Sequence, residues 1–81
     1  MSLPRDVSGK DLIKMLASLG YQSTRQVGSH IRLTTKENGT HHITIPNHKP
    51  LKLGTLSAIL KDIGQHFGKT KDEVWNTISR K

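Results

Sequence analysis

The sequence contains no cysteine and few aromatic or acidic residues. Without cysteine there can be no disulfide bond, thiolate nucleophile or cysteine-ligated zinc site, so the chain suits a reducing cytoplasm. Its three aromatic residues, Tyr21, Phe67 and Trp75, are too few to line a large enclosed pocket for a bulky cofactor. Residues 1–9 lack the apolar segment of a signal peptide, and no apolar run approaches the length of a membrane span.

Positive charge is what the chain has in excess. Its 81 residues include 13 Lys and Arg against 6 Asp and Glu, a formal net charge of +7. This length suits one domain over residues 1–81, with a core at residues 8–66. Between positions 22 and 61 six basic residues oppose one acidic residue, a local charge of +5: Arg25, Arg32, Lys36, Lys49, Lys52 and Lys61 against Glu37. Such a balance indicates an anionic partner, of which nucleic acid is the first candidate and an acidic protein the second. The alternative is a solvated face that only keeps a small protein soluble.

A first helix is predicted over residues 9–19. Leu12, Leu16 and Leu19 recur at helical spacing. Ser8 is expected to cap this helix together with a carboxylate three residues later, and Gly20 to end it in a left-handed conformation.

Two more helices are predicted in the second half of the chain. Thr55 is expected to cap a helix that runs to about His66, and Gly68 to follow its end. Thr70 and Glu73 have the capping-box spacing, which predicts an additional short helix over about residues 70–79.

Three strands are predicted between the first two helices. Residues 21–27 form a polar strand, and Ile31 and Leu33 then alternate with polar residues, as do Ile43 and Ile45. A three-residue loop at positions 37–39 sets Leu33 opposite Ile43, and Ile31 opposite Ile45. We expect this register, because a two-residue loop would mix apolar and polar side chains on a half-buried face.

These elements predict the order α-β-β-β-α-α and an α+β layer sandwich, in which helices cover one face of a three-stranded antiparallel sheet. The uncovered face is expected to carry Arg32, Thr34, His42 and Thr44, and to be free for a ligand.

The five histidines do not form a metal site by their spacing. His41 and His42 are adjacent in a strand and must point to opposite faces. Carboxylates are too scarce for a two-metal nuclease, so no metal or other cofactor is expected. Ser29 and His30 do not form a hydrolase triad either, since strand neighbours diverge and no acidic residue can orient the imidazole.

His30 can act alone as a proton-transfer group on the uncovered face. An unperturbed imidazole titrates near pH 6.5. Cleavage of RNA needs a base for the 2′-hydroxyl, cations for the phosphate and an acid for the leaving 5′-oxygen. A surface histidine that merely bonds RNA or solvent remains the alternative.

The predicted register ranks the other histidines around His30. His42 falls four residues away along the sheet, too far to form a dyad, whereas Pro46 falls opposite His30. His48 therefore emerges close by, as a second acid or a phosphate contact. His41 shares parity with the apolar residues and is expected to be half-buried, while His66 is expected to act as a cation near its helix end.

Four segments resemble the HicA family of toxin mRNA interferases, from residue 8 to about residue 64. The first helix and its exit (Ser8–Leu12 and Leu19–Tyr21) are similar to the family's opening, and Arg25–His30 resembles its R-Q-x-G-S-H signature. Ile45–His48 resembles the following strand end, and Leu53–Lys61 the second-helix motif. The tail beyond residue 70 departs from many members, and suggests an added helix that packs on the domain and offers a surface for a partner.

The resemblance implies a fold like the double-stranded-RNA-binding domain and a cytoplasmic endoribonuclease. Such a toxin would cleave mRNA without a metal, and would be silenced by a cognate HicB-type antitoxin that covers the active face. In the signature the histidine is the catalytic residue, which corresponds to His30.

Further RNA contacts are expected around His30. Arg25, Arg32, Lys49 and Lys52 are candidates for the phosphates, and Gly28 with Ser29 for close approach of the RNA backbone. Two other functions stay open: a non-catalytic RNA-binding module that blocks translation by occupancy, and a DNA-binding repressor subunit.

Overall fold

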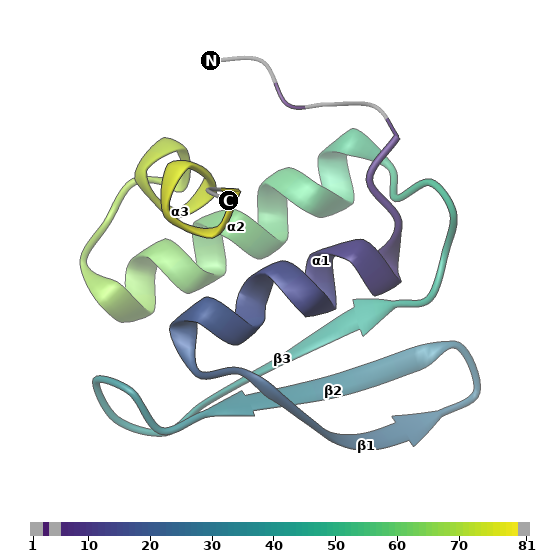
Figure 1. Ribbon diagram of the computed structural model, residues 1–81, viewed down its shortest axis with the longest axis horizontal. Coiled ribbons are helices and arrows are strands. Elements are labelled where there is room, and N and C mark those ends of the chain that lie inside the picture. The colour runs from purple at the N-terminus through teal and green to yellow at the C-terminus, as the bar shows by residue number, and fades with distance from the viewer. Residues whose placement is uncertain (1–2, 4–5, 80–81) are drawn as a thin grey trace.

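The computed structural model describes residues 3 and 6–79 (Figure 1). Helix α1 (Gly9–Leu16) continues into a short 3-10 helix, η1 (Ala17–Leu19). The strands β1 (Gln22–Val27), β2 (His30–Thr35) and β3 (His41–Pro46) follow, and then the helices α2 (Leu53–Phe67) and α3 (Lys71–Ile78). The predicted order of elements and the α+β class are confirmed.

Capping boxes begin α1 and α3, as predicted. The Asp11 N–H donates to Ser8 Oγ at 3.0 Å, and the Ser8 N–H donates to Asp11 Oδ2 at 3.3 Å. Thr70 and Glu73 exchange the same two bonds at 2.9 and 3.1 Å. These bonds satisfy N–H groups that the first turn leaves without partners. They also hold the pKa of the Asp11 and Glu73 carboxyls below the ordinary value, mainly through the backbone N–H of the capping residue.

The start of α2 differs from the prediction. The helix begins at Leu53, with Lys52 in the N-cap position and no side-chain capping bond, so Thr55 lies inside the first turn. The earlier start follows from the loop, because Leu51 is buried in the core and the Leu56 N–H donates to the Lys52 carbonyl at 2.9 Å.

The strands form one antiparallel sheet in the order β1-β2-β3. Leu33 pairs with Ile43 and Ile31 with Ile45, so the register predicted from side-chain parity is confirmed. The connection of β2 to β3 reverses at Asn38 and the following glycine, whose φ angles are 57° and 93°.

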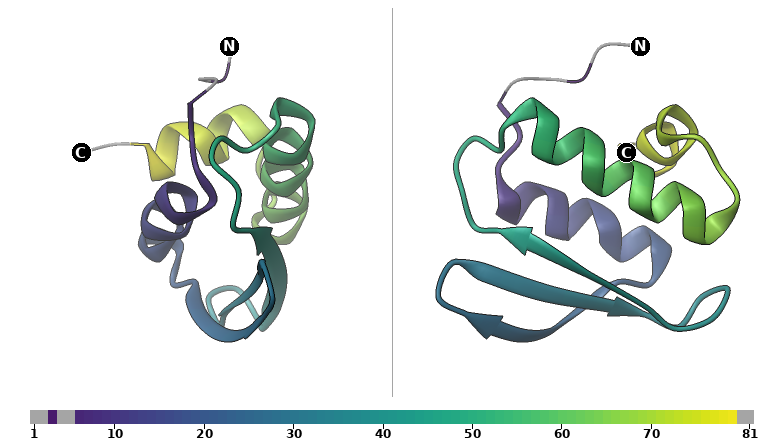
Figure 2. Two further views of the ribbon diagram at one scale, coloured as in Figure 1. Left: turned by 90° about the vertical axis from the view of Figure 1, so that its right-hand side faces the viewer. Right: turned by 180° about the vertical axis from the view of Figure 1, so that it is seen from behind.

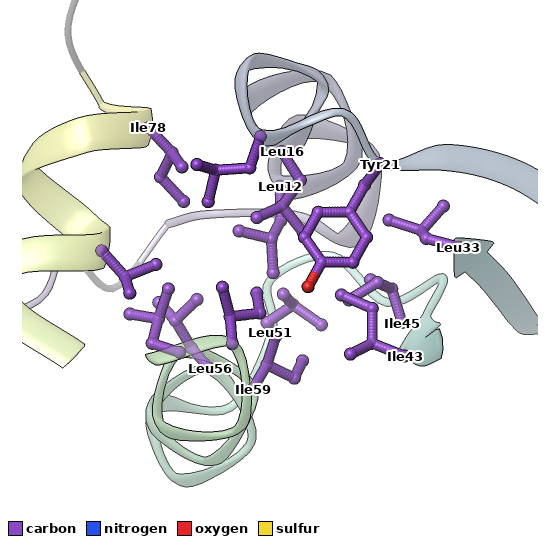
Figure 3. Packing of buried hydrophobic residues seen from close by; sticks show 14 of the residues in the cluster. Leu12, Leu16, Tyr21, Leu33, Ile43, Ile45, Leu51, Leu56, Ile59 and Ile78 are labelled. Atoms are coloured by element: carbon purple, nitrogen blue, oxygen red, sulfur yellow. The ribbon is translucent and has the colours of Figure 1, made fainter. Parts of the chain in front are cut away.

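Helices cover one face of this sheet. α1 and α2 run across it, and α3 lies on their other side, away from the strands (Figures 1 and 2). Apolar side chains fill the space between these layers, as Figure 3 shows. The C-terminal helix belongs to this core, because its Val74 and Ile78 are buried.

The opposite face of the sheet is uncovered. It presents the polar side chains predicted for it, which are exposed or half-buried: Arg32, Thr34, His42 and Thr44. β1 extends the sheet beyond the helices, since all six of its residues are exposed. A bulge between Ser23 and Arg25 interrupts its pairing with β2.

Candidate active site

The β1–β2 turn places His30 at the start of the central strand. Val27 pairs with His30, so Gly28 and Ser29 alone form the turn. Gly28 has a φ of 59°, in the left-handed region that favours glycine. A Cβ at Gly28 would meet no atom within 4 Å, so the surface above the turn is open to a ligand.

The end of β3 holds this turn in place. The Asn47 N–H donates to the Ser29 carbonyl at 2.6 Å, and His30 pairs with Pro46 as predicted. The turn, the end of β3 and the start of α1 lie at the same end of the molecule in both side views (Figure 1 and the right view of Figure 2). His30 is therefore fixed by two neighbouring strands.

The His30 side chain lies on the uncovered face of the sheet. It is exposed, while Ile31, Leu33 and Thr35, which alternate with the exposed positions of β2, are buried against the helical layer. Within residues 3 and 6–79 its ring has no hydrogen-bond partner, so both imidazole nitrogens are available to a ligand.

A hollow of about 210 Å³ opens beside His30. It is lined by side chains from all three strands: Arg25, Val27, His30, Arg32 and Thr44. The pairing of Arg25 with Arg32 and of Val27 with His30 arranges four of these residues in two neighbouring cross-strand rows. We call this feature the His30 hollow.

The two arginines give the His30 hollow its charge. Like charges directly opposite one another destabilise a strand pair. Neither guanidinium is within ion-pair distance of a carboxylate in the described part of the chain. Two unpaired guanidinium groups beside a free imidazole form an arrangement that can bind a phosphate and exchange a proton with what is attached to it.

The remaining candidates lie outside the His30 hollow. His48 is exposed, and its backbone carbonyl accepts a 2.9 Å hydrogen bond from the Gly9 N–H. Lys49 lines a neighbouring groove beside α1, and Lys52 is exposed at the N-cap of α2. The structure thus brings Arg25 and Arg32 together with His30, and places the other predicted contacts in the adjoining loop.

Two of the other histidines belong to a cluster at the opposite end of the sheet. The Tyr21 hydroxyl lies 2.7 Å from His41 Nδ1, and His41 Nε2 lies 3.3 Å from Asp62 Oδ1. Burial, and to a smaller extent Asp62, raises the pKa of Tyr21 to about 12. His66 stacks on His41 with ring centroids 4.5 Å apart, and its Nε2 lies 2.9 Å from the Glu37 carbonyl oxygen. His41 is half-buried as expected, whereas the His66 ring bonds the β2–β3 loop instead of its own helix end.

Sequence reasoning missed Val27 as a lining residue of the His30 hollow, and it placed Thr44 on the uncovered face without naming it as a ligand contact. Val27 is an exposed large apolar side chain, with 61% of its surface accessible. The two-residue turn Gly28-Ser29 could have revealed it, because such a turn pairs Val27 directly with His30. The β1 pattern alone was too polar to define that register.

Two general features are absent from residues 3 and 6–79. No three His, Asp or Glu side chains there are placed to share a metal ion. No helix in the same part of the chain combines the length and the apolar character needed to cross a membrane.

Comparison with known proteins identifies the family. No curated protein and no solved structure gave a match. A family model described as the HicA toxin of bacterial toxin–antitoxin systems matches residues 9–65. This range runs from the start of α1 almost to the end of α2 and includes the whole His30 hollow, while α3 lies beyond it. The chain therefore belongs to the HicA toxin family, as the toxin of a toxin–antitoxin pair whose partner is a cognate antitoxin.

Proposed function

We propose that this toxin is an endoribonuclease that cleaves mRNA, and so inhibits translation, with His30 as general acid and base and without a metal ion. The observation that carries the proposal is the location of the His30 imidazole, which has no partner in the described chain. It lies in one hollow with Arg25 and Arg32, which face each other across β1 and β2. Such a toxin would act in the cytoplasm, with a HicB-type antitoxin covering the uncovered face of the sheet.

The reaction uses a nucleophile that the RNA itself supplies. His30 takes the proton of a ribose 2′-hydroxyl, whose oxygen attacks the adjacent phosphorus as the bond from phosphorus to the 5′-oxygen breaks. The products are a 2′,3′-cyclic phosphate and a free 5′-hydroxyl. Among the residues lining the His30 hollow, only the protonated imidazole can return a proton to the leaving oxygen near neutral pH.

The two arginines stabilise the charge that develops on the phosphate. Guanidinium groups donate paired hydrogen bonds to phosphate oxygens, and donors held in position act most strongly on the transition state. Further phosphate contacts are assigned to His48, Lys49 and Lys52, and the open turn at Gly28 and Ser29 admits the RNA backbone.

His30→Ala tests the proposal, with His42→Ala as its matched control. His42 is exposed on the same face but lies outside the His30 hollow, where its Nδ1 is 2.8 Å from Thr34 Oγ1. We expect His30→Ala to reduce the cleavage rate by about 10²–10⁴-fold, the range for loss of a general acid–base group, and to bind RNA almost normally. His42→Ala should cleave at nearly the wild-type rate.

Two further measurements separate cleavage from occupancy. Wild-type cleavage should persist in excess chelator and leave cyclic phosphate ends. Growth arrest by the wild type without any cut transcript would show instead that the toxin blocks translation by binding RNA.

A further inference from the structure

A second basic surface lies beside α1, outside the His30 hollow. It is a groove of about 390 Å³ between the first turns of α1 and the loop from β3 to α2. Its lining contains three lysines and one carboxylate: Ser8, Lys10, Asp11, Lys14, Asn47 and Lys49. We call it the α1 groove.

The α1 groove has a net positive charge that nothing in the described chain neutralises fully. Lys10 and Lys14 are one helical turn apart, a spacing at which like charges repel. Lys49 comes from the facing loop, and none of the three lysines is in an ion pair with a residue among 3 and 6–79. The single carboxylate, Asp11, already accepts a hydrogen bond from the Ser8 N–H. Its pKa is lowered mainly by the two hydrogen bonds with Ser8, and to a smaller extent by the positive charges of Lys14 and Lys49.

The α1 groove adjoins the end of β3, the segment that pairs with His30. Asn47 lines the groove, and its N–H donates to the Ser29 carbonyl next to His30 at 2.6 Å. Gly9, at the start of α1, packs so closely on Pro46 and Asn47 that a Cβ there would collide with the Pro46 carbonyl oxygen. The segment that pairs with His30 is thus also one wall of the groove.

The lining of the α1 groove also indicates the kind of ligand. It contains no apolar residue, whereas the centre of a protein–protein interface is rich in aromatic and apolar side chains. A positively charged groove that follows the backbone is typical of proteins that bind single-stranded nucleic acid.

We propose that Lys10, Lys14 and Lys49 bind backbone phosphates of the same RNA chain whose scissile phosphate lies in the His30 hollow. The substrate is then a single-stranded RNA long enough to pass from the hollow over Asn47 into the α1 groove. This inference rests on the proposed function in taking RNA as the ligand, and adds a second contact region for it.

The experiment measures RNA binding in the non-cleaving His30→Ala chain, with Lys10→Gln and Lys14→Gln added together. The probe is a labelled oligouridine of about 12 nucleotides, within the size range of single-strand sites. Affinity for this probe should fall on the order of tenfold. The slope of log K against log salt should become less negative by about 1.4, because each lost phosphate contact removes about 0.7 from its magnitude. Affinity for a uridine trinucleotide should not change.

The matched control removes two lysines elsewhere, by Lys69→Gln and Lys71→Gln. These residues lie in the α2–α3 connection and at the start of α3, at the end of the molecule opposite the β1–β2 turn (Figure 1). Lys10 and Lys14 are both exposed, so replacing them removes no buried contact of α1 and folding should be preserved.

Each outcome has a distinct meaning. If the α1 variant and the control variant lose equal affinity for the 12-nucleotide RNA, the inference is overturned, because only the net charge of the protein would then matter. Unchanged RNA binding with weakened binding of the antitoxin would also overturn it, and would assign the groove to the antitoxin. If the wild type never cuts RNA but the α1 pair selectively loses RNA affinity, the proposed catalysis fails and the second contact region stands.

Discussion

The Asn47 N–H donates a 2.6 Å hydrogen bond to the Ser29 carbonyl, which joins the end of β3 to the turn that carries His30. The next residue along, His48, accepts a hydrogen bond from the Gly9 N–H at 2.9 Å. One short segment thus fixes both the β1–β2 turn and the start of α1. The same segment therefore holds the strand end beside the His30 hollow and one wall of the α1 groove.

Arg32→Gln should separate binding of the substrate from stability of the fold. We expect cleavage to fall by about 10²–10³-fold, as when a donor to the transition state is lost. The free energy of unfolding should rise by about 0.2–1 kcal/mol, because Arg25 and Arg32 are directly opposed in the sheet. Enzyme kinetics and urea unfolding measure the two effects. A loss of both activity and stability would mean that Arg32 supports the fold.

Gly28 is predicted to serve both the turn and the RNA. Gly28→Ala should cost about 1–2 kcal/mol of stability, since its left-handed conformation is strained for a residue with a Cβ. Gly28→Asn should cost less, because asparagine tolerates this conformation. If RNA approaches the turn closely, the fully folded Asn variant should still cleave more slowly than the wild type. Wild-type cleavage by that variant would restrict Gly28 to a role in the turn.

Gly9→Ala should weaken the contact between α1 and the end of β3. The added methyl group would collide with the Pro46 carbonyl oxygen, and we expect a loss of about 1–3 kcal/mol of stability together with reduced cleavage. Gly54→Ala is the matched control, because a Cβ at Gly54 in α2 would meet no atom within 4 Å. It should stabilise the helix by about 0.5–1 kcal/mol. Thermal unfolding compares the two variants, and a gain in stability at both positions would contradict the close contact at Gly9.

Tyr21 should make the free energy of unfolding depend on pH in the alkaline range. Its pKa is raised from 10.0 to about 12, so the folded chain keeps a phenol proton that the unfolded chain releases. This stabilisation is fully present below pH 10.0 and is lost as the pH rises towards 12. Tyr21→Phe should lose about 0.5–1.5 kcal/mol at neutral pH with its hydrogen bond to His41, and should unfold with a flatter alkaline profile. Parallel profiles for the two proteins would contradict the assignment.

Ile78→Ala tests whether α3 is part of the folded core. Ile78 is 4% exposed, and its truncation should cost about 2–5 kcal/mol. Asn76→Ala, on an exposed position of the same helix, should change stability by less than about 0.5 kcal/mol. Equal, small effects would show that the helix beyond the family match is only loosely attached.

The β2–β3 hairpin was the element best predicted from the sequence, because the apolar side chains of both strands must lie on the same buried face of the sheet. The pairs Leu33–Ile43 and His30–Pro46 followed from that single rule. The two capping boxes were also predictable, since each depends on residues only three positions apart. His30 is predicted as the catalytic residue because elimination of other chemistry and the family signature indicate the same position, and this assignment stays a prediction.

Features set by tertiary contacts were not predictable. Thr55 is a good capping residue, yet the buried Leu51 fixes the loop so that α2 starts earlier. The α1 groove joins Lys10 and Lys14 to Lys49, which is distant in sequence, and no local pattern relates them. The lysines of α1 look like an ordinary solvated helix face until the loop is folded against them.

The hydrogen bonds from Gly9 to His48 and from Leu51 to Val7 determine when the chain can complete its fold during synthesis. The amino-terminal helix leaves the ribosome well before the segment that anchors it. A nascent chain that ends before Asn47 has His30 but neither the strand end that holds it nor the wall of the α1 groove. The fold around His30 can therefore be completed only late in translation, once residues near position 51 have been added and have folded back onto the amino-terminal segment.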